Sequence, residues 1–474
     1  MGPLSGFRGL VNLRLNTRVS AILKLTVLFH PLSKPGRYLR LVTGELHIKH
    51  HITSPENLTS LKRILPQAHL KILTEQTFPN MCCRFKSILL ALVFAASFHA
   101  PTSSLNTETA SSAAAKTTIL VGTQDNIDGL VYAITWDGKD EIEYLTQTNV
   151  THKMPSWLAL HPTNRKKVLV IYEDGAKHQN FKIGMDGKLT AEFKAMKSGP
   201  GPSSGFGTFS KDGRYMVFVD YPNGGYQVAR YLANGSSYPI PQNETLDDPN
   251  RYLGPNPSHP SHPHQFVEHP KLDIFYIPNL ATNLTSSYHF KGGKMTFQGS
   301  LKVDGGPRHM VINKKGAFGW VLTETSCMIQ PVKIDEAGKL TYNGKPLAVT
   351  QANQAVGAGA EILLSHDERM IVASNRQTEG NQNDYLTTFE VDSESGRLSK
   401  PTTYDTDGQV IRGMAFNKDS TLLVFGHEAN GTIGMFGRDL ETNYLTLLTP
   451  HMLNLTAAAR IQSPASPSIF VFLD

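Results

Sequence analysis

Cysteine is scarce in this chain of 474 residues, which contains 3 cysteines alongside 39 glycines and 28 prolines. Cys82 and Cys83 fall in a segment with the pattern of a cleavable secretory signal, so only Cys327 would remain in a processed protein. A single cysteine excludes an intramolecular disulfide, and the folded state must therefore be stabilised by a buried core. Cys327 itself is expected to be a small buried hydrophobic residue in a strand.

The signal segment also lacks an apolar run long enough to cross a membrane. Its apolar part, residues 88–96, is too short to span a bilayer, follows the basic segment MCCRFKS and precedes small residues. This order is typical of a secretory signal peptide, here at residues 81–100. Because such a signal works at an N-terminus, we expect translation to begin at Met81 and residues 1–80 to be a non-native N-terminal extension. A mitochondrial presequence is the competing interpretation, since residues 1–40 are rich in arginine and poor in acids. No transmembrane segment is predicted.

The body of the protein lacks the positive charge that binding to nucleic acid requires. The whole chain has a formal net charge of +6, but residues 1–80 hold 11 Lys and Arg against 3 Asp and Glu, and the part beyond residue 100 is net acidic. Nucleic acid is therefore excluded as a partner. Secretion, to the extracellular space or the cell wall, agrees with six glycosylation sequons beyond residue 100. The sequon residues are Asn149, Asn234, Asn243, Asn283, Asn430 and Asn454.

Motifs of cofactor and serine-hydrolase chemistry are absent. The sequence contains no Gly-rich phosphate loop, no Gly-x-Ser-x-Gly elbow and no cysteine pair in its body, so neither a nucleotide cofactor nor a serine nucleophile is expected. His262, His264 and His269 suggest a zinc site. Alternation along a strand places His262 and His264 on one face and His269 on the other, past the end of the strand, which is a poor geometry for a metal. We therefore predict neither a cofactor nor a metal.

What the chain does contain is a repeated hairpin. Residues 305–324, GGPRHMVINKKGAFGWVLTE, are typical of two short strands around a Lys-Gly turn. Similar hairpins recur along the chain, and two further strands follow each of them. The repeats begin at Pro155, Pro202, His262, Gly306, Gly359 and Ile411. Four strands at a period of about 45–55 residues are typical of a β-propeller blade.

The two ends of the folded region contribute to one blade. Residues 101–116 form a Ser/Thr/Ala-rich, flexible lead-in, and the next three predicted strands lack the opening hairpin strand of the later repeats. Residues 467–473 resemble the start of the first repeat at 155–160 and are expected to supply that missing innermost strand. The sequence thus predicts an all-β, seven-bladed β-propeller over residues 117–474, with blade 1 closed by the C-terminal strand.

The ends of the hairpins are unusually charged. Residues eight positions before and after each turn would lie opposite each other and form one ring around the axis. The charged members of this ring are His264, Arg308, Arg376, Arg412, Glu173, Glu324 and Glu428, and the others are Trp157, Gly205, Tyr221, Leu280 and Ala360. One interpretation is a purely structural set of salt bridges, and the other is a binding site. The Pro- and Asn-rich segment 239–262 is expected to lie over the mouth of the ring or to be only a connection between blades.

Four motifs resemble a known family. HPHQ at 262–265, GPRHM at 306–310, AEILLSHDERMIVASNR at 360–376 and RGMAF at 412–416 are similar to motifs of the seven-bladed lactonase family, and the resemblance covers about residues 117–474. The family includes fungal carboxy-cis,cis-muconate cyclases and propeller-type 6-phosphogluconolactonases. Resemblance to the cyclases implies a metal-free site made of His264, Arg308, Glu324 and Arg376. Those cyclases act inside cells, so a secreted copy departs from their role in a pathway.

The main functional hypothesis is a secreted carboxy-cis,cis-muconate cyclase-like enzyme, which closes a polycarboxylate to a lactone without a cofactor. Arg308, Arg376 and Arg412 would bind the carboxylates of a small anionic substrate and stabilise enolate-like charge. His264 and Glu324 are the candidate general acid and base, in either order. One alternative is a lactonase that hydrolyses 6-phosphogluconolactone or a similar sugar lactone, because phosphate suits the same arginines. The other is a non-catalytic secreted glycoprotein propeller that binds partners at the cell surface.

Overall fold

The computed structural model divides the chain into two compact units, residues 1–109 and 110–474. The structure describes residues 6–16, 19–31, 37–49 and 72–77 of the first unit, and residues 116–473 of the second except 125–128, 200–203, 243–246, 252–260, 351–356, 377–382, 400 and 462–464. The first unit contains one antiparallel sheet whose strands follow chain order. These strands are β1 (Gly6–Asn16), β2 (Val19–Pro31), β3 (Arg37–Lys49) and β4 (Ile72–Thr77). The predicted signal peptide and residues 101–115 of the predicted lead-in lie outside the described residues.

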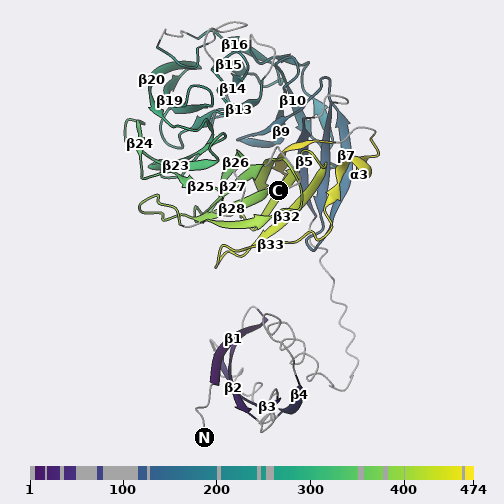
Figure 1. Ribbon diagram of the computed structural model, residues 1–474. Coiled ribbons are helices and arrows are strands. Elements are labelled where there is room, and N and C mark those ends of the chain that lie inside the picture. The colour runs from purple at the N-terminus through teal and green to yellow at the C-terminus, as the bar shows by residue number, and fades with distance from the viewer. Residues whose placement is uncertain are drawn as a thin grey trace, which may run out of the picture. The chain divides into compact units, whose positions relative to one another are not determined.

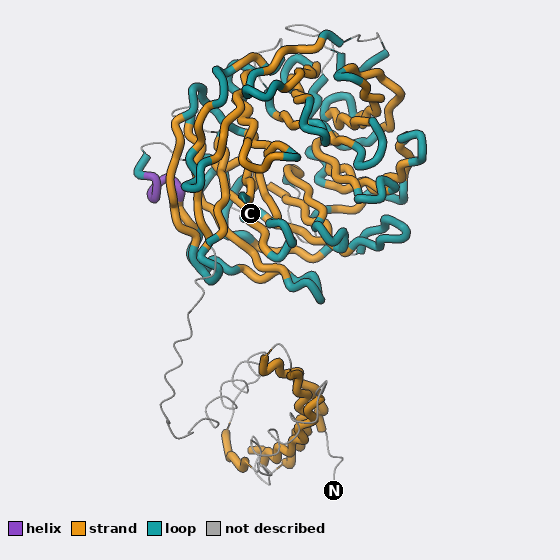
Figure 2. Tube along the Cα trace, turned by 180° about the vertical axis from the view of Figure 1, so that it is seen from behind, coloured by secondary structure: helices purple, strands orange, loops and turns teal. Residues whose placement is uncertain are grey.

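The second unit folds as seven antiparallel sheets placed radially around a common centre (Figure 1). Strands dominate the trace, and the short helix α3 (Leu455–Ala459) lies at its edge (Figure 2). The middle strands of the blades are rich in β-branched and aromatic residues, which suits strands buried on both faces. The predicted all-β, seven-bladed propeller is therefore confirmed.

The blades follow one another in chain order, and the strands of each run from the innermost outward. Blade 1 contains β35 (Pro467–Phe472), β5 (Thr117–Thr123), β6 (Leu130–Trp136) and β7 (Ile142–Asn149). Blade 2 contains β8 (Trp157–His161), β9 (Asn164–Tyr172), β10 (Lys177–Ile183), β11 (Leu189–Ala191) and β12 (Met196–Lys197). Blade 3 contains β13 (Phe206–Phe209), β14 (Tyr215–Asp220), β15 (Gly225–Tyr231) and β16 (Ser237–Ile240). Blade 4 contains β17 (Val267–Glu268), β18 (Ile274–Asn279), β19 (Leu284–Lys291) and β20 (Lys294–Lys302).

The remaining three blades have the same plan. Blade 5 contains β21 (Pro307–Ile312), β22 (Phe318–Thr323), β23 (Met328–Ile334), β24 (Leu340–Tyr342) and β25 (Leu347–Ala348). Blade 6 contains β26 (Ala358–Leu364), β27 (Met370–Arg376), β28 (Tyr385–Glu390) and β29 (Thr402–Asp405). Blade 7 contains β30 (Ile411–Phe416), β31 (Leu422–His427), β32 (Thr432–Arg438), β33 (Leu445–Leu447) and β34 (Leu453–Asn454), followed by α3 (Leu455–Ala459). None of the helices in the part of the chain that the structure describes is long and apolar enough to be a membrane span.

The hydrophobic core consists of clusters between neighbouring blades. Each of seven clusters combines residues of two blades that are adjacent in the ring, and together they run from blade 1 to blade 7 and back to blade 1. Cys327 belongs to the cluster between blades 5 and 6 and is 1% exposed, as the sequence predicts. Burial of this apolar surface is the main stabilising contribution, since no disulfide is present in the described residues.

The C-terminal strand closes the ring in the predicted way. β35 pairs antiparallel with β5 through Phe470 opposite Val121. Phe470 and Phe472 are 3% and 4% exposed and belong to the cluster between blades 7 and 1, whereas Ile469 belongs to the cluster between blades 1 and 2. Residues from the far end of the chain therefore connect three blades, which leaves blade 1 without an open inner edge.

Four innermost strands carry a β-bulge near the axis. In blade 5, Pro307 pairs with Thr323 and His309 pairs with Leu322, so Arg308 is an extra residue without a partner on β22. The register shifts by one residue in the same way in blades 6, 7 and 1. The extra residues there are Ala360 or Glu361 in β26, Arg412 in β30 and Ser468 in β35.

The register of the hairpins corrects one sequence-based expectation. The residues eight positions before and after each turn lie at the same end of each hairpin, but they are not directly opposite each other. The bulge also breaks the alternation of side chains, because two residues of the bulged strand share the place opposite one residue of its partner. Consecutive residues such as Arg308 and His309 both line the same cavity as a result.

Glycine allows the innermost strands to approach one another near the axis. A Cβ atom on Gly413 of β30 would lie 2.1 Å from the backbone oxygen of Ser468, and one on Gly359 of β26 would lie 2.5 Å from the backbone oxygen of Thr323. Such distances leave no room for a side chain. Gly413 within the RGMAF motif and Gly359, which directly precedes the motif at 360–376, are therefore required for packing.

Candidate functional site

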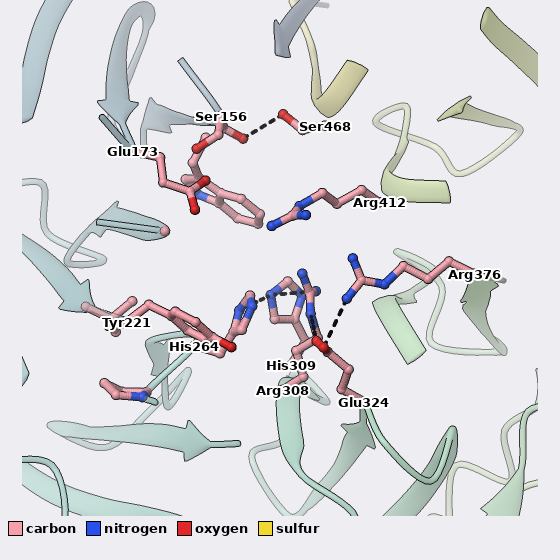
Figure 3. Close-up of a pocket in the computed structure, with 14 residues that line it drawn as sticks. Ser156, Glu173, Tyr221, His264, Arg308, His309, Glu324, Arg376, Arg412 and Ser468 are labelled. Atoms are coloured by element: carbon pink, nitrogen blue, oxygen red, sulfur yellow. Dashed lines mark hydrogen bonds and ion pairs between the residues drawn. The ribbon is translucent and has the colours of Figure 1, made fainter. Parts of the chain in front are cut away.

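The inner ends of the blades enclose a cavity of about 220 Å3 (Figure 3). All five predicted catalytic and substrate-binding residues line it, so the structure brings together side chains from four blades. Nine of the twelve predicted ring positions line the cavity, whereas Leu280, Ala360 and Glu428 do not. The lining residues are Ser156, Trp157, Glu173, Gly205, Val219, Tyr221, Pro263, His264, Arg308, His309, Glu324, Arg376, Arg412 and Ser468.

Glu324 bridges two arginines in one half of the cavity. One of its carboxylate oxygens accepts a hydrogen bond from Arg308 Nε at 2.8 Å, and the other lies 3.1 Å from Arg376 Nη2. Arg308 is 2% exposed and also donates from Nη1 to the backbone oxygen of Ala360 on the next blade. Its guanidinium is therefore held by bonds to two blades, which fixes its direction.

Arg376 and Arg412 are less fully engaged than Arg308. Arg376 is 8% exposed, and its buried Nε has no hydrogen-bond partner in the described part of the chain. Arg412 Nη1 lies 3.6 Å from Glu428, which is a loose ion pair. Both guanidiniums thus keep donors that can turn to an anion in the cavity.

A second set of contacts lies on the side of blades 1 and 2. Gln124 donates from Nε2 to Glu173 at 2.8 Å, and Ser468 donates from Oγ to the backbone oxygen of Ser156 at 2.9 Å. Figure 3 shows Glu173 and Arg412 on opposite sides of the opening between the two halves. Glu173 therefore has a partner outside the arginine cluster, and Arg412 is the cation nearest this polar side.

Two histidines and a glutamate form a hydrogen-bonded chain. Nδ1 of His264 lies 3.2 Å from Nε2 of His309, and Nδ1 of His309 lies 2.8 Å from a carboxylate oxygen of Glu361. His309 and Glu361 are 1% and 4% exposed. The edge of the Tyr221 ring packs against His264, and the ring of Trp157 packs against His309, so aromatic groups cover the histidine pair.

The electrostatics of the cavity favour an anion and a neutral histidine. Burial, reinforced by the neighbouring arginines, holds the pKa of His264 well below its usual range. Burial and the charge of Arg376 lower the pKa of Arg308 to about 10, so the guanidinium remains protonated near neutral pH. Three cations close together in a buried site repel one another, and a bound anion relieves this repulsion.

Sequence reasoning missed His309, Glu361 and Ser468. His309 follows Arg308 directly, so alternation along a regular strand would place the two side chains on opposite faces. The sequence does not predict the bulge that turns both side chains to the cavity. Pro307 and glycine residues lie next to the bulge, but they do not define its position. The motifs at 306–310 and 360–376 contain His309 and Glu361. Only the structure shows that these two side chains, which come from neighbouring blades, are in contact.

The other two histidines that were considered for a zinc site have partners of their own. His269 is 3% exposed and its Nε2 bonds to the backbone oxygen of Gly316, while His262 stacks on Tyr221. Within the residues that the structure describes, no group of three or more His, Cys, Asp or Glu side chains is arranged to hold a metal ion. The predicted loop over the mouth includes residues 243–246 and 252–260, which are outside the described part of the chain.

Comparison with known proteins relates this chain to lactonases. The family model for "Lactonase, 7-bladed beta-propeller" matches residues 118–456. A 6-phosphogluconolactonase of Bacillus subtilis is 24% identical over 257 residues, which cover 52% of this chain and 70% of that protein. An uncharacterized protein of Staphylococcus saprophyticus is 23% identical over 341 residues, which cover 70% of this chain and 95% of that protein.

Solved structures confirm the architecture. The periplasmic gluconolactonase of Pseudomonas aeruginosa matches with a TM-score of 0.65 at 20% identity, over 76% of this chain and 99% of that one. A protein of Lactobacillus plantarum matches with a TM-score of 0.62 at 20% identity, over 76% of this chain and 100% of that one. At these identities the likeness shows the fold.

Proposed function

The chain belongs to the seven-bladed β-propeller lactonase family, and we propose that it is an enzyme that hydrolyses a small sugar lactone carrying an anionic group. One observation carries the proposal: three guanidiniums and a neutral histidine line a single cavity on the axis. A phosphorylated lactone such as 6-phosphogluconolactone has both the anion and the ester that these groups suit. The name of the relative in Bacillus subtilis agrees with this substrate class.

The arginines divide into two roles. Arg376 and Arg412 keep free donors and are proposed to bind the phosphate or carboxylate of the substrate, for which a planar guanidinium fork is well suited. Arg308 is fixed by Glu324 and by the backbone of Ala360, and it lies next to the histidine pair. It is proposed to stabilise the negative charge that develops on the lactone carbonyl oxygen.

Hydrolysis requires one proton to be moved twice. Water attacks the carbonyl carbon while His264 accepts a proton from it, the acyl C–O bond breaks, and the departing ring oxygen takes the proton back. A neutral imidazole can begin this cycle, whereas an imidazolium cannot. Glu324 is proposed to act mainly by orienting Arg308 and Arg376, because both of its oxygens are occupied by them.

Cycloisomerisation of a carboxymuconate is the competing reaction at the same residues. The cluster of three arginines favours it, since a tricarboxylate offers one anion to each guanidinium. The relatives named as lactonases favour hydrolysis instead. A propeller that only binds an anion at the cell surface is the remaining alternative.

The test is substrate consumption by the purified chain. It is supplied in parallel with 6-phosphogluconolactone, with unphosphorylated gluconolactone and with 3-carboxy-cis,cis-muconate. Proton release reports lactone opening after subtraction of the uncatalysed reaction, and loss of diene absorbance reports cyclisation. We expect hydrolysis of the phosphorylated lactone, with a lower kcat/KM for the unphosphorylated one.

Two variants serve as site and control. His264→Gln should abolish most of the activity, whereas His289→Gln changes a half-buried histidine on β19 that does not line the cavity and should have no effect. Diene loss without lactone opening would replace hydrolysis by the cyclase reaction. Silence on all three substrates would contradict an enzyme of either kind.

We also propose that the propeller is secreted and N-glycosylated. Four sequon residues support this because they are exposed: Asn149, Asn234, Asn430 and Asn454. Asn283 is half-buried, so we expect it to be poorly modified. Asn243 lies outside the described residues. Enzymatic deglycosylation of the natural protein should lower its apparent mass, and an unchanged mass would contradict the proposal.

A further inference from the structure

Three side chains from three consecutive blades form a chain that leads away from the cavity. His264 precedes β17 in blade 4, His309 is in β21 of blade 5 and Glu361 is in β26 of blade 6. Glu361 does not line the cavity, and hydrolysis as described above requires only His264. His309 and Glu361 are buried and hydrogen-bonded to each other. Buried polar groups destabilise the fold unless each donor faces an acceptor.

The hydrogen-bond partners determine which nitrogen of each ring carries the proton. Arg308 can only donate, and its Nη1 lies 3.3 Å from Nε2 of His309, so this nitrogen is an acceptor. The proton of His309 must then be on Nδ1, where it is donated to Glu361. Nδ1 of His264 faces the same nitrogen, whose one lone pair is then shared between Arg308 and His264, and two facing lone pairs are avoided only if Nδ1 of His264 carries a proton. Its Nε2 is left with a lone pair and has no partner among the described residues.

We propose that Glu361 and His309 are positioning residues that hold His264 in the tautomer with an unprotonated Nε2 and that take up its positive charge during turnover. This rests on the proposed function, because the charge appears only when a substrate proton is transferred. Glu361 also accepts a hydrogen bond from the backbone nitrogen of Ile362 with the same oxygen, which fixes the carboxylate. The pair is therefore rigid before the substrate arrives.

The charges around His264 and His309 explain why a proton relay, here the transfer of a proton from His264 to His309, is needed. The charged or titratable groups that face the pair are Arg308, Arg376, Arg412, Glu173, Glu324, Glu361 and Tyr221. Burial, and then the arginines, oppose a positive charge on His264. Burial also lowers the pKa of His309, but there Glu361 offsets part of this effect. When Nε2 of His264 accepts a proton, the Nδ1 proton can pass to Nε2 of His309. His264 is then neutral again, the charge is paired with Glu361, and the reverse transfer restores the starting state.

The first test observes the tautomers directly in the wild-type chain. Two-bond proton–nitrogen correlation spectra of a sample with 15N-labelled histidine distinguish Nδ1–H from Nε2–H. The signals of the pair are identified by their loss in His264→Gln and His309→Gln. We expect both rings to carry the proton on Nδ1. An Nε2–H tautomer of His264 would overturn the proposal, whatever the substrate is.

The second test removes only the charge of the relay. In Glu361→Gln the amide oxygen can still accept from Nδ1 of His309, so the tautomers persist. We expect kcat to fall at least tenfold with little change in KM, since an acid–base partner contributes about 10²–10⁴. The acidic limb of the kcat/KM profile should move to lower pH, because the protonated histidine pair loses its counter-ion.

A matched control separates this effect from stability. Glu192→Gln removes another buried carboxylate, which pairs with Lys167 at 2.8 Å and does not line the cavity. It should leave both kcat and the pH profile unchanged. Equal profiles for wild-type and Glu361→Gln would overturn the relay. If the wild-type is inactive on every lactone, the proposed function fails while the tautomer spectrum still decides the positioning role.

Discussion

Blades 1, 4, 5, 6 and 7 differ from blades 2 and 3 at the edge that faces the axis. The innermost segments of the first group carry a one-residue register shift there. In blade 4 it lies between the bridge of Pro263 with Asn279 and the pairing of Val267 with Tyr276, whereas β8 and β13 show no register shift at that end in the described residues. The bulged group places Arg308, His309, Arg412 and Ser468 on the cavity wall. The regular innermost strands contribute mainly aromatic or small residues, such as Trp157.

The difference shows how the regularity of the innermost strands determines which residues line the cavity. A regular innermost strand turns successive side chains alternately towards the two neighbouring blades, so consecutive residues do not share one part of the cavity wall. A bulge presents two consecutive residues and turns the strand, which concentrates cations and their partners in a small arc. His264 lies in the shifted segment of blade 4, between Pro263 and the two-residue strand β17, and contacts His309 of the next blade.

The largest expected effect follows from removing the bulged strand that is most distant in sequence. Deleting residues 467–474 exposes β5 as an open edge and removes the buried side chains of Ile469, Phe470 and Phe472. Each contributes about 1.5–3 kcal/mol, so the free energy of unfolding should fall by several kcal/mol. Denaturant unfolding with a structural probe measures this. A truncated protein that melts within a degree or two of the full chain would show that blade 1 does not need β35.

Sequence predicted the blades well and the bulges poorly, for a physical reason. Strand periodicity and turn residues are local, so the hairpin at 305–324 and the echo of residues 155–160 near the C-terminus could be recognised without a structure. The charged ring also followed from distance to the turn, because hairpin geometry places such residues at one end. Whether Arg308 and His309 face the same way depends on the register with β22 and on the approach of blade 6, which no local pattern specifies.

The next largest effect separates a bulge from its side chain. Deleting Arg308 regularises the pairing of β21 with β22, whereas Arg308→Ala removes the same guanidinium and keeps the bulge. The deletion should turn His309 away from Glu361 and cost about 10²–10⁴ in kcat beyond the loss in Arg308→Ala. Steady-state kinetics, with circular dichroism melting as the check on folding, make the comparison. Equal losses in the two variants would mean that the bulge has no part in the site.

A smaller effect tests whether the cations bind substrate or only close the channel. Arg376→Met and Arg412→Met keep the bulk of the side chain and remove its charge, so kcat/KM should fall about ten- to a hundredfold. Arg214→Met is the control, because that arginine pairs with Asp212 on the surface with 63% of its side chain exposed. A structural ring of salt bridges predicts the reverse pattern, namely lower melting temperatures with unchanged activity per folded molecule.

The smallest effect concerns a buried histidine on the strand that pairs with the bulged strand β30. His427 pairs with Ile411 next to the bulge of β30, is fully buried and contacts the hydroxyls of Thr432 and Thr406. Burial lowers its pKa from 6.5 to about 4, so the folded protein holds it neutral while the unfolded chain protonates first as the pH falls. The contribution of neutral His427 to the free energy of unfolding is thus complete above pH 6.5 and is lost as the pH falls towards 4. By pH 5.5 the free energy of unfolding is lower by about 1 kcal/mol on this account. The free energy of unfolding should therefore fall less between pH 7 and pH 5.5 in His427→Gln than in the wild-type. The control variant His289→Gln should show the same fall as the wild-type. An unchanged difference in His427→Gln would show that His427 is not held neutral by the fold.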